Sequence, residues 1–423
     1  MALVFALAVT ARVVYFLVLS PTSPEWSPEV LPRDGWLTIA TNLARGHGYS
    51  TNSLLTYFPV DRLVPTAARS PVPVLLLAAL VRLAGSHWYY PALLFSWCCS
   101  GLVAIAAYWI AVRASGRHFL GLWTGVVFAV YLSEMYITTT FAVASEPIFS
   151  ALLAAYLVLS IRAVDRCSVP ISTSAGAALA LASLSRPAVL LLPVVPIAWM
   201  LYRLRRQSVA MIVGLSLTFA VIHVPWIVRN YAMFGRPIVT TTLGGFVLYR
   251  HNAKIEKSQY DLGYSLSSFV PMVRNFVATT GRPLQSYDEP ELNDLLSAEG
   301  LRIIRAHPWR YLKLSAYRTI WIWYADNSGR GLYAVENAAI YLLALVGLWY
   351  AVRAREPIYG LLLLNIAYFV AVYSALNVQY RYICPVMPLM ILIAGLPVDA
   401  WVARTRRGGQ SGAPRAASMQ SNA

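Results

Sequence analysis

The chain has 423 residues, of which 58% are hydrophobic and only 12% are charged, with a formal net charge of +16. Soluble domains carry roughly 25% charged residues, so this composition and a mean hydropathy of +0.57 exclude an ordinary soluble protein and predict a polytopic membrane protein. The basic excess would favour nucleic acid as the partner of a soluble protein, but here the arginines follow membrane topology, which argues against it.

Ten hydrophobic segments recur that are long enough, or nearly so, to cross a bilayer: 1–20, 90–112, 119–132, 147–161, 171–184, 188–201, 209–224, 333–351, 358–375 and 383–402. The first is interrupted only by Arg12, and no small-x-small cleavage pattern follows it. We therefore expect a retained signal anchor. The ten segments predict an all-α membrane domain, residues 1–402, with about ten transmembrane helices.

Clusters of arginine occupy alternate connections, and short arginine-rich loops remain in the cytoplasm. The clusters are Arg113 and Arg117; Arg162 and Arg166; Arg203, Arg205 and Arg206; Arg353 and Arg355; and Arg404, Arg406 and Arg407. Only Asp165, Glu356 and Asp399 among the acidic residues fall on this side or at its boundary. The pattern predicts a plasma-membrane protein with both termini in the cytoplasm, two large outer loops (21–89 and 225–331) and a disordered tail at 403–423.

Three shorter helices are predicted in the outer loops. Segments 36–45 and 71–83 are too short or too interrupted for confident spans and are interpreted as interfacial helices. Segment 307–324 is rich in tryptophan, tyrosine and basic residues, which suits the membrane surface.

Metal and cofactor motifs are absent from the sequence. The four cysteines form no C-x-x-C pattern, and the chain contains no Walker, Rossmann or HExxH motif. We therefore expect neither a cofactor nor a metal.

A lone carboxylate, Asp34, follows the first span and precedes the 36–45 segment. Asp is a favoured N-cap residue, so Asp34 could simply cap that helix. The run from Asp34 to Tyr49 reads as an acid, a short helix and then G-x-G-Y.

Further short motifs follow in order. They are Arg-Ser-Pro-Val-Pro at 69–73, Ser-Glu at 145–146, Leu-Ser-Arg-Pro at 184–187, Pro-Trp-x-x-Arg-Asn at 225–230, glycines at 235, 244 and 245, His-Pro at 307–308, and Tyr-Arg-Tyr at 380–382 before prolines 385 and 388. Over nearly the whole chain this ordered set resembles the dolichyl-phosphate-mannose protein mannosyltransferase superfamily, which comprises glycosyltransferase family 39 and its bacterial relatives.

The resemblance implies a GT-C type membrane glycosyltransferase. Such an enzyme transfers a hexose or pentose from a polyprenyl-phosphate donor to a hydroxyl or amine of a lipid, glycan or protein acceptor on the outer side. Residue chemistry agrees with this. Asp34 is the candidate general base for the acceptor proton, and Arg69, Arg229 and Arg381 are candidates for holding the donor phosphate. Each arginine could instead be an interfacial anchor.

Five more residues are candidates for binding the acceptor or supporting the site. Glu146 begins a predicted span, where an ionisable group usually has a purpose, although it could serve only to stabilise the helix N-terminus. Arg186 could mark an outer turn. Tyr49, Asn230 and Tyr382 belong to the motifs that carry the resemblance.

One difference between this sequence and the superfamily pattern narrows the predicted activity. Some members pair the first-loop Asp with an adjacent Glu, whereas Gly35 follows Asp34, and neither outer loop contains D-x-D. The sequence therefore fits a bacterial-type enzyme that uses an undecaprenyl- or decaprenyl-phosphate sugar better than a protein mannosyltransferase.

Three alternatives remain open. A lipid-carrier transporter or flippase should show internal repeats and interrupted helices that meet at the membrane midplane, and no convincing repeat is present. A non-enzymatic scaffold would not need Asp34 with several outer arginines. A polysaccharide polymerase or ligase also uses outer arginines on lipid phosphates, and the first-loop Asp with G-x-G-Y favours the transferase over it.

Overall fold

The structure is a computed structural model that describes residues 1–19, 35–142, 144–260, 262, 266–324 and 331–411. A bundle of long helices forms its body: α1 (Ala2–Leu19), α4 (Tyr89–Ser115), α5 (His118–Ala129), α6 (Leu132–Thr140), α7 (Glu146–Arg166), α8 (Val169–Ser183), α9 (Val194–Leu204), α10 (Val209–Phe234), α15 (Gly331–Ala354), α16 (Pro357–Ala375) and α17 (Met387–Ser411). Short 3-10 turns join several of them, including Pro187–Val189, Arg205–Ser208, Tyr380–Tyr382 and Cys384–Val386.

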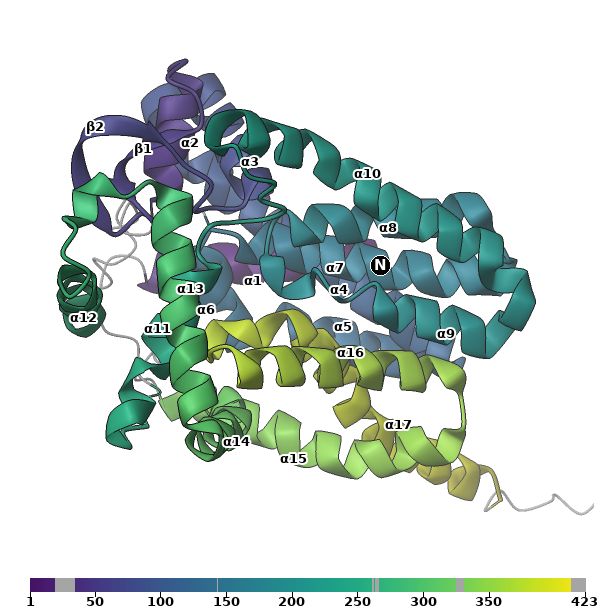
Figure 1. The fold of residues 1–423 in the computed structure, drawn as a ribbon. Coiled ribbons are helices and arrows are strands. Elements are labelled where there is room, and N and C mark those ends of the chain that lie inside the picture. Colours follow the sequence, from purple (N-terminus) through teal and green to yellow (C-terminus); the bar gives the residue numbers. More distant parts are fainter. Residues whose placement is uncertain (20–34, 143, 261, 263–265, 325–330, 412–423) are drawn as a thin grey trace, which may run out of the picture.

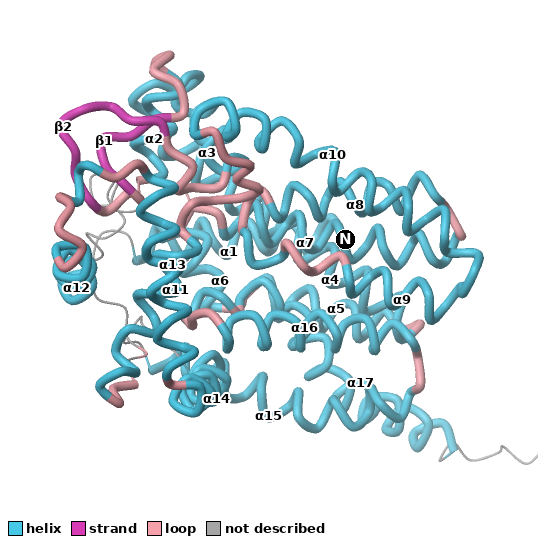
Figure 2. Tube along the Cα trace, viewed as in Figure 1, coloured by secondary structure: helices cyan, strands magenta, loops and turns pink. Residues whose placement is uncertain are grey.

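The two large loops fold into a cap at one end of the bundle, opposite the turn between α9 and α10 (Figure 1). The first loop contributes α2 (Trp36–Ala44), β1 (Ser50–Leu54), β2 (Phe58–Pro65) and α3 (Pro71–Ala84), and the second contributes α11 (Gly244–Asn252), α12 (Leu266–Ala278), α13 (Glu289–Ala306) and α14 (Pro308–Tyr324). The antiparallel hairpin β1–β2, coloured magenta in Figure 2, was not predicted.

The lengths of the apolar helices are consistent with a protein that crosses a membrane several times. Within the described residues, six helical stretches are long and apolar enough to span, or seven if the bent pair α5 and α6 counts as one span. One of the six, Pro187–Phe234, contains both α9 and α10, while α1 and α8 are shorter apolar helices. The prediction of about ten spans is therefore not confirmed as a number, although the all-α membrane architecture is.

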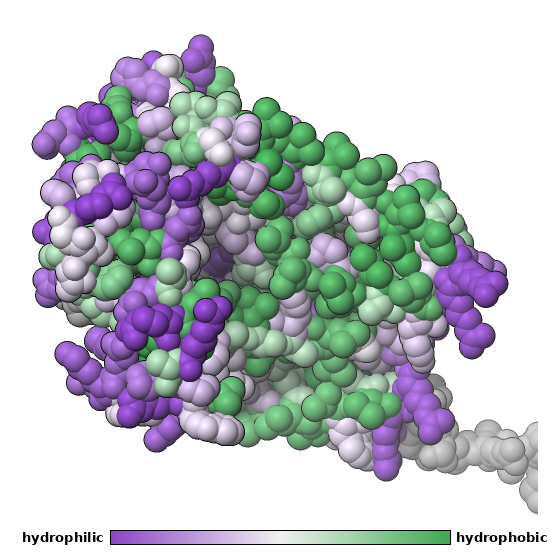
Figure 3. Space-filling model, in the orientation of Figure 1, coloured by the Kyte–Doolittle hydropathy of each residue, from purple (hydrophilic) through white to green (hydrophobic). Residues whose placement is uncertain are grey.

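Figure 3 shows where the bilayer would lie: a broad hydrophobic face covers the bundle and hydrophilic residues gather at both of its ends. Close helix packing inside this band depends on glycine, as is usual in membranes. A Cβ on Gly176 of α8 would meet the backbone of Leu215 in α10, and one on Gly347 of α15 would meet Ile393 in α17.

Charged side chains stabilise the break between α5 and α6, where the two helix axes bend by 47°. The buried Arg12 donates from Nη1 to the carbonyl of Ala129, the last residue of α5, at 2.8 Å. Glu336 of α15 accepts from the backbone N–H of Leu132, the first residue of α6, at 3.0 Å. A cation at a helix C-terminus and a carboxylate at a helix N-terminus both complement the helix dipoles. The otherwise costly Arg12 therefore has a structural role.

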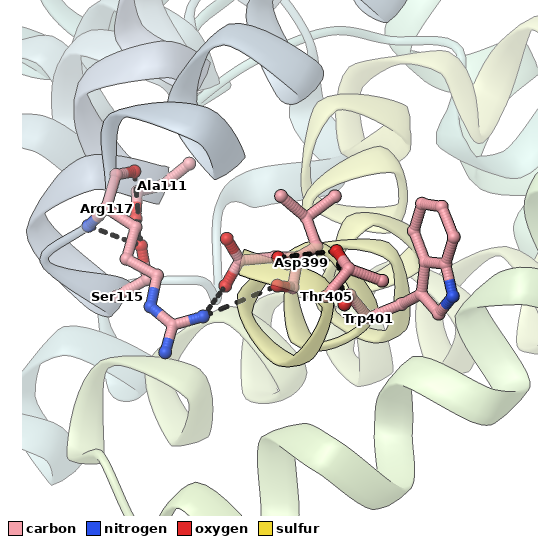
Figure 4. A network of polar contacts seen from close by, with 7 residues as sticks. Ala111, Ser115, Arg117, Asp399, Trp401 and Thr405 are labelled. Carbon is pink, nitrogen blue, oxygen red and sulfur yellow. Dashed lines mark hydrogen bonds and ion pairs between the residues drawn. The ribbon is translucent and has the colours of Figure 1, made fainter. Parts of the chain in front are cut away.

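Ion pairs explain two of the three acidic residues on the arginine-rich side. Arg117 pairs with Asp399 at 2.8 Å and so ties the turn between α4 and α5 to α17 (Figure 4). Arg113 pairs with Asp165 at 2.6 Å.

Two predicted boundaries were wrong. Helix α10 continues through Pro225 to Phe234, so the second large loop begins later than residue 225. A proline forfeits one backbone hydrogen bond but need not end a helix that lies in a membrane. Helix α17 extends to Ser411, past the predicted start of the tail; residues 412–423 lie outside the described residues.

Candidate functional site

Asp34, the predicted base, lies outside the described residues, but its neighbour Gly35 is described. Gly35 occupies the N-cap position of α2 with φ +76°, and no side chain of the described residues caps this helix. A Cβ there would lie 2.9 Å from the side chain of Thr56 in the hairpin turn. Both the left-handed backbone and this close approach require glycine.

Arg69 lies beside this turn, on the segment that leads into α3. Its guanidinium stacks over the ring of Trp36 at 5.3 Å, and Nη2 donates to Thr56 Oγ1 at 3.1 Å and to Tyr57 Oη at 3.2 Å. The aromatic rings and hydroxyls hold the cation in one orientation at the start of α2, the helix that Asp34 precedes.

Arg229, near the end of α10, forms most of its hydrogen bonds with backbone carbonyl groups. Nη1 donates to the carbonyl of Thr66 at 2.8 Å and to Asn230 Oδ1 at 2.9 Å, and Nη2 donates to the carbonyl of Tyr49 at 2.9 Å. Its guanidinium also lies over the ring of Tyr49 at 5.2 Å. These contacts fasten the first outer loop to α10.

Tyr49 and Asn230 complete this attachment. Tyr49 Oη donates to the carbonyl of Arg69 at 2.8 Å, and burial raises the pKa of its phenol well above the usual value. Asn230 Nδ2 donates to the carbonyl of Ile238 at 2.9 Å. Tyr49 thereby supports the loop that carries Arg69, and Asn230 holds the segment that follows α10.

Glu289, at the start of α13, joins the two outer loops and was not singled out in the sequence. Oε1 accepts from the backbone N–H of Ala67 at 2.7 Å and from Thr242 Oγ1 at 2.5 Å, and Oε2 accepts from Thr66 Oγ1 at 2.7 Å. The side chain is buried, and burial raises the pKa of this carboxyl. Its only sequence signal was its place after Asp288, which heads an N-terminal capping box with Glu291.

The second charged cluster lies at the ends of three bundle segments that are distant in sequence. Glu146 begins α7, Arg186 follows α8, and Arg381 lies in the short turn before α17. Glu146 Oε1 is 3.1 Å from Arg186 Nη2 and 3.2 Å from Arg381 Nε. Two cations thus share one buried carboxylate.

Aromatic rings surround this cluster. The Arg186 guanidinium lies 4.6 Å from the ring centroid of Tyr382, and Tyr382 stacks on Tyr373 at 4.6 Å. The Arg381 guanidinium lies 4.5 Å from the ring of Phe141. Nη1 of Arg186 is buried and has no hydrogen-bond partner in the part of the chain that the structure describes. A buried donor without a partner is costly, so this nitrogen is suited to an incoming acceptor.

The two groups of arginines adjoin each other. The backbone N–H of Val72, three residues after Arg69, donates to the carbonyl of Leu184, two residues before Arg186, at 3.2 Å. The structure therefore brings Arg69, Tyr49, Arg229 and Asn230 together on the cap side of this contact, and Glu146, Arg186, Arg381 and Tyr382 on the bundle side. Among the described residues no group of three or more His, Cys, Asp or Glu could hold a metal ion.

No protein-family model matches the chain, and no curated protein matches it by sequence. Solved structures of the archaeal oligosaccharyltransferase AglB from Archaeoglobus fulgidus do match its fold. One, in complex with an inhibitory peptide and a dolichol-phosphate, has a TM-score of 0.59 at 12% identity. An apo form of the Archaeoglobus fulgidus oligosaccharyltransferase has a TM-score of 0.61 at 13% identity.

Each match covers 98% of this chain and 52% of the other, so the chain spans about half the length of these proteins. At such low identity the likeness concerns the fold. It confirms the expected fold class, so the chain is an all-α membrane protein with a GT-C glycosyltransferase fold.

Proposed function

We propose that this protein is a membrane glycosyltransferase that moves a sugar from a polyprenyl-phosphate donor to an acceptor hydroxyl or amine at the cap end of the bundle. The observation that carries the proposal is the buried cluster of Glu146, Arg186 and Arg381. Two guanidinium groups converge on one buried carboxylate, and the buried Nη1 of Arg186 donates to no described residue. A phosphate that enters from the membrane would supply the missing acceptor.

Arg186 and Arg381 are the cations that we assign to the donor phosphate. Arginine offers a planar fork that matches phosphate oxygens, and the buried, unpartnered Nη1 of Arg186 supplies a donor for one of them. As the sugar–phosphate bond breaks, negative charge grows on the leaving phosphate, and fixed cations in a site without water stabilise that charge. The Glu146 carboxylate orients both guanidinium groups and is a positioning residue.

Asp34 is the group that we assign to the acceptor proton. It adjoins Gly35, and Gly35 packs against Thr56, which accepts a hydrogen bond from Arg69. A carboxylate in this region can take the proton of the attacking hydroxyl, while Arg69 lies on the same side of the site. Arg229, Tyr49 and Asn230 hold the loop in place, because their polar atoms bond to the protein itself.

The lipid tail of the donor needs an apolar surface that is open to the bilayer. The stretches that contain α10 and α15 have only 22% of their most apolar window buried inside the protein, and Figure 3 shows a continuous hydrophobic face over these helices. The fold likeness to a protein described in complex with a dolichol-phosphate supports the same class of donor.

Conservative changes of arginine test the phosphate assignment. Lysine keeps the charge but loses the planar fork, so Arg381→Lys and Arg186→Lys should each weaken binding of a polyprenyl-phosphate sugar roughly 10- to 150-fold, the range that corresponds to a charge-assisted hydrogen bond. Arg229→Lys is the matched control, and we expect a loss of thermal stability with little change in donor affinity once the protein is folded. Equal donor affinity in the Arg381 and Arg186 variants and the wild type would overturn the assignment.

A second variant tests the base. Asp34→Asn keeps the size of the side chain but cannot accept a proton, so turnover should fall at least ~10²-fold with donor affinity preserved. Near-normal turnover of purified Asp34→Asn protein would remove Asp34 from the reaction.

A further inference from the structure

An apolar groove opens at the end of the bundle opposite the cap. Its walls are α9 on one side and the junction of α15 and α16 on the other, and its cavity volume is about 390 Å³. Trp199 and Tyr202 of α9 face Val352, Gly360 and Leu364 across it. Trp199 Nε1 donates to the carbonyl of Pro357 at 3.3 Å, which holds the two walls at a fixed separation.

The size and lining of the groove suit a lipid acyl chain better than a globular protein partner. Its volume lies in the range of small-molecule pockets, roughly 300–1,000 Å³, and its lining is mainly hydrophobic. The side chains at its rim are open to the bilayer, with Tyr202 76% and Val352 64% exposed. Lipid is the medium that contacts such a surface in a membrane protein.

One arginine, Arg355, lines the groove, and four more lie in the two turns that adjoin it. Arg203, Arg205 and Arg206 follow Tyr202 at the end of α9, and Arg353 and Arg355 follow Val352 at the end of α15. None of the five forms an ion pair with any carboxylate of the described residues. Glu356, which follows Arg355, also lines the groove, so its carboxylate offsets one of these five positive charges. Figure 3 shows the corresponding hydrophilic groups where the α9–α10 turn and the α15–α16 turn border the hydrophobic face.

Backbone conformation gives a second, independent sign. Arg205 and Arg355 both have positive φ angles, 51° and 53°, which is uncommon for residues other than glycine, asparagine and aspartate. Each follows a helix that forms one wall of the groove. Strained backbone that persists without glycine is a reason to look for function, and here it falls on the residue that directly follows each of the two wall helices.

We propose that this groove binds one acyl chain of an anionic phospholipid and that the surrounding arginines bind its phosphate headgroup. Basic pockets between transmembrane helices suit such lipids, and each arginine near the membrane surface contributes about 1 kcal/mol toward anionic lipid. The site lies at the end of the bundle opposite the proposed donor site and does not depend on the proposed reaction.

The experiment measures the lipids that stay bound to the full-length protein. The protein is placed in nanodiscs of equal parts phosphatidylglycerol and phosphatidylcholine with identical acyl chains, released from them, and analysed by native mass spectrometry. We expect one phosphatidylglycerol to remain bound in preference to phosphatidylcholine. Arg355→Gln should reduce the retained phosphatidylglycerol about fivefold, the factor that corresponds to about 1 kcal/mol, and Arg205→Gln should do the same. Arg166→Gln, which removes the same charge from the end of α7, is the matched control.

A second variant fills the groove itself. A Cβ on Gly360 meets nothing within 4 Å, and leucine favours a helix more than glycine does, so Gly360→Leu should fold normally, as size-exclusion chromatography and the melting temperature in detergent would report. It should lose the bound lipid with every arginine intact.

Three outcomes would overturn the proposal: equal retention of the two phospholipids, no effect of any variant, or displacement of the phosphatidylglycerol by undecaprenyl phosphate, which would make the groove a carrier site.

Discussion

Glu289 offers the sharpest test of what holds the two outer loops together. Among the described residues, its carboxyl is the only group that forms hydrogen bonds with Thr66, Ala67 and Thr242 together. Burial raises the pKa of this carboxyl, so the folded protein favours the protonated form more than the unfolded chain does. A protonated carboxyl can donate to Thr66 Oγ1 through one oxygen while the other oxygen accepts from Ala67 and Thr242. Glutamine has the same shape and the same pattern of one donor side and one acceptor side.

Two substitutions therefore separate hydrogen bonding from charge. Glu289→Gln should cost the cap less than Glu289→Ala, about 0.5–1.5 kcal/mol, since its amide oxygen still accepts from Ala67 and Thr242. Glu289→Ala leaves the buried N–H of Ala67 without a partner, at about 1–3 kcal/mol, and removes the hydrogen bonds of two hydroxyls, at about 0.5–1.5 kcal/mol each, so the loss should total about 2–6 kcal/mol.

Hydrogen exchange at the amides of Ala67 and Thr242 is the appropriate measurement, because local opening of the cap exposes both. The N–H of Thr242 also donates to the carbonyl of Ala67 at 3.1 Å, so it reports on separation of the two loops. Asp294→Ala, in the next turn of the helix and with its side chain 65% exposed, is the control and should leave both amides protected. Equal loss of protection in Glu289→Gln and Glu289→Ala would show that an ionised carboxylate is required and would refute the reasoning.

The same carboxyl predicts a pH dependence. A folded pKa above the unfolded value of about 4.5 means that the folded state binds the proton more tightly. The stability of the cap should therefore fall as pH rises from 4.5 through the folded pKa, and Glu289→Gln should abolish that part of the profile.

Further predictions concern the cap and the topology. A Cβ on Gly245 would collide with the carbonyl of Asn293 in α13, whereas one on Gly244 meets nothing; Gly245→Ala should lower the melting temperature by several degrees and Gly244→Ala should not. His251 is partly buried, its Nε2 lies 3.3 Å from the amide nitrogen of Asn377, and the loss of solvent around it lowers its pKa well below 6.5. Stability should therefore fall as pH drops below 6.5, and His251→Gln should flatten that slope in melting curves from pH 5 to 8. Single cysteines at Asn52 and Ser286 should react with an impermeant reagent from outside the cell, and one at Gln207 should not; the reverse pattern would invert the predicted topology.

Long apolar segments were the part of the fold that the sequence predicted best. The prediction of 358–375 corresponds to α16 (Pro357–Ala375), and 147–161 lies within α7 (Glu146–Arg166). Such segments are easy to recognise in a sequence because a helix that crosses the bilayer needs about 20 apolar residues in a row. Interruptions were harder: the bend between α5 and α6 is stabilised by Arg12 and Glu336, which come from other helices, so no local pattern marks it.

The β1–β2 hairpin was missed for a definable reason. Its turn passes through Leu55 and Thr56, both with positive φ, where hairpins normally use Asn-Gly or similar pairs. Leu55 is fully buried in the core of the cap, and its backbone lies close to Glu289. Tertiary contacts therefore stabilise a turn that local propensity disfavours, and the periodicity of the sequence does not reveal this turn.

The candidate site, like the fold, was only partly predictable from the sequence. The motifs drew attention to Arg229 and Arg381, but sequence position alone could not distinguish a guanidinium that bonds to backbone carbonyls from one that shares a buried carboxylate. That distinction depends on Thr66 and Tyr49 in one case and on Glu146 in the other, all more than a hundred residues away in the chain. Because Arg186 binds the same oxygen of Glu146, a change at any member of this cluster should alter the other two. Donor affinity in the double variant Arg186→Lys with Arg381→Lys should therefore not equal the sum of the two single effects, whereas Arg229→Lys should combine additively with either.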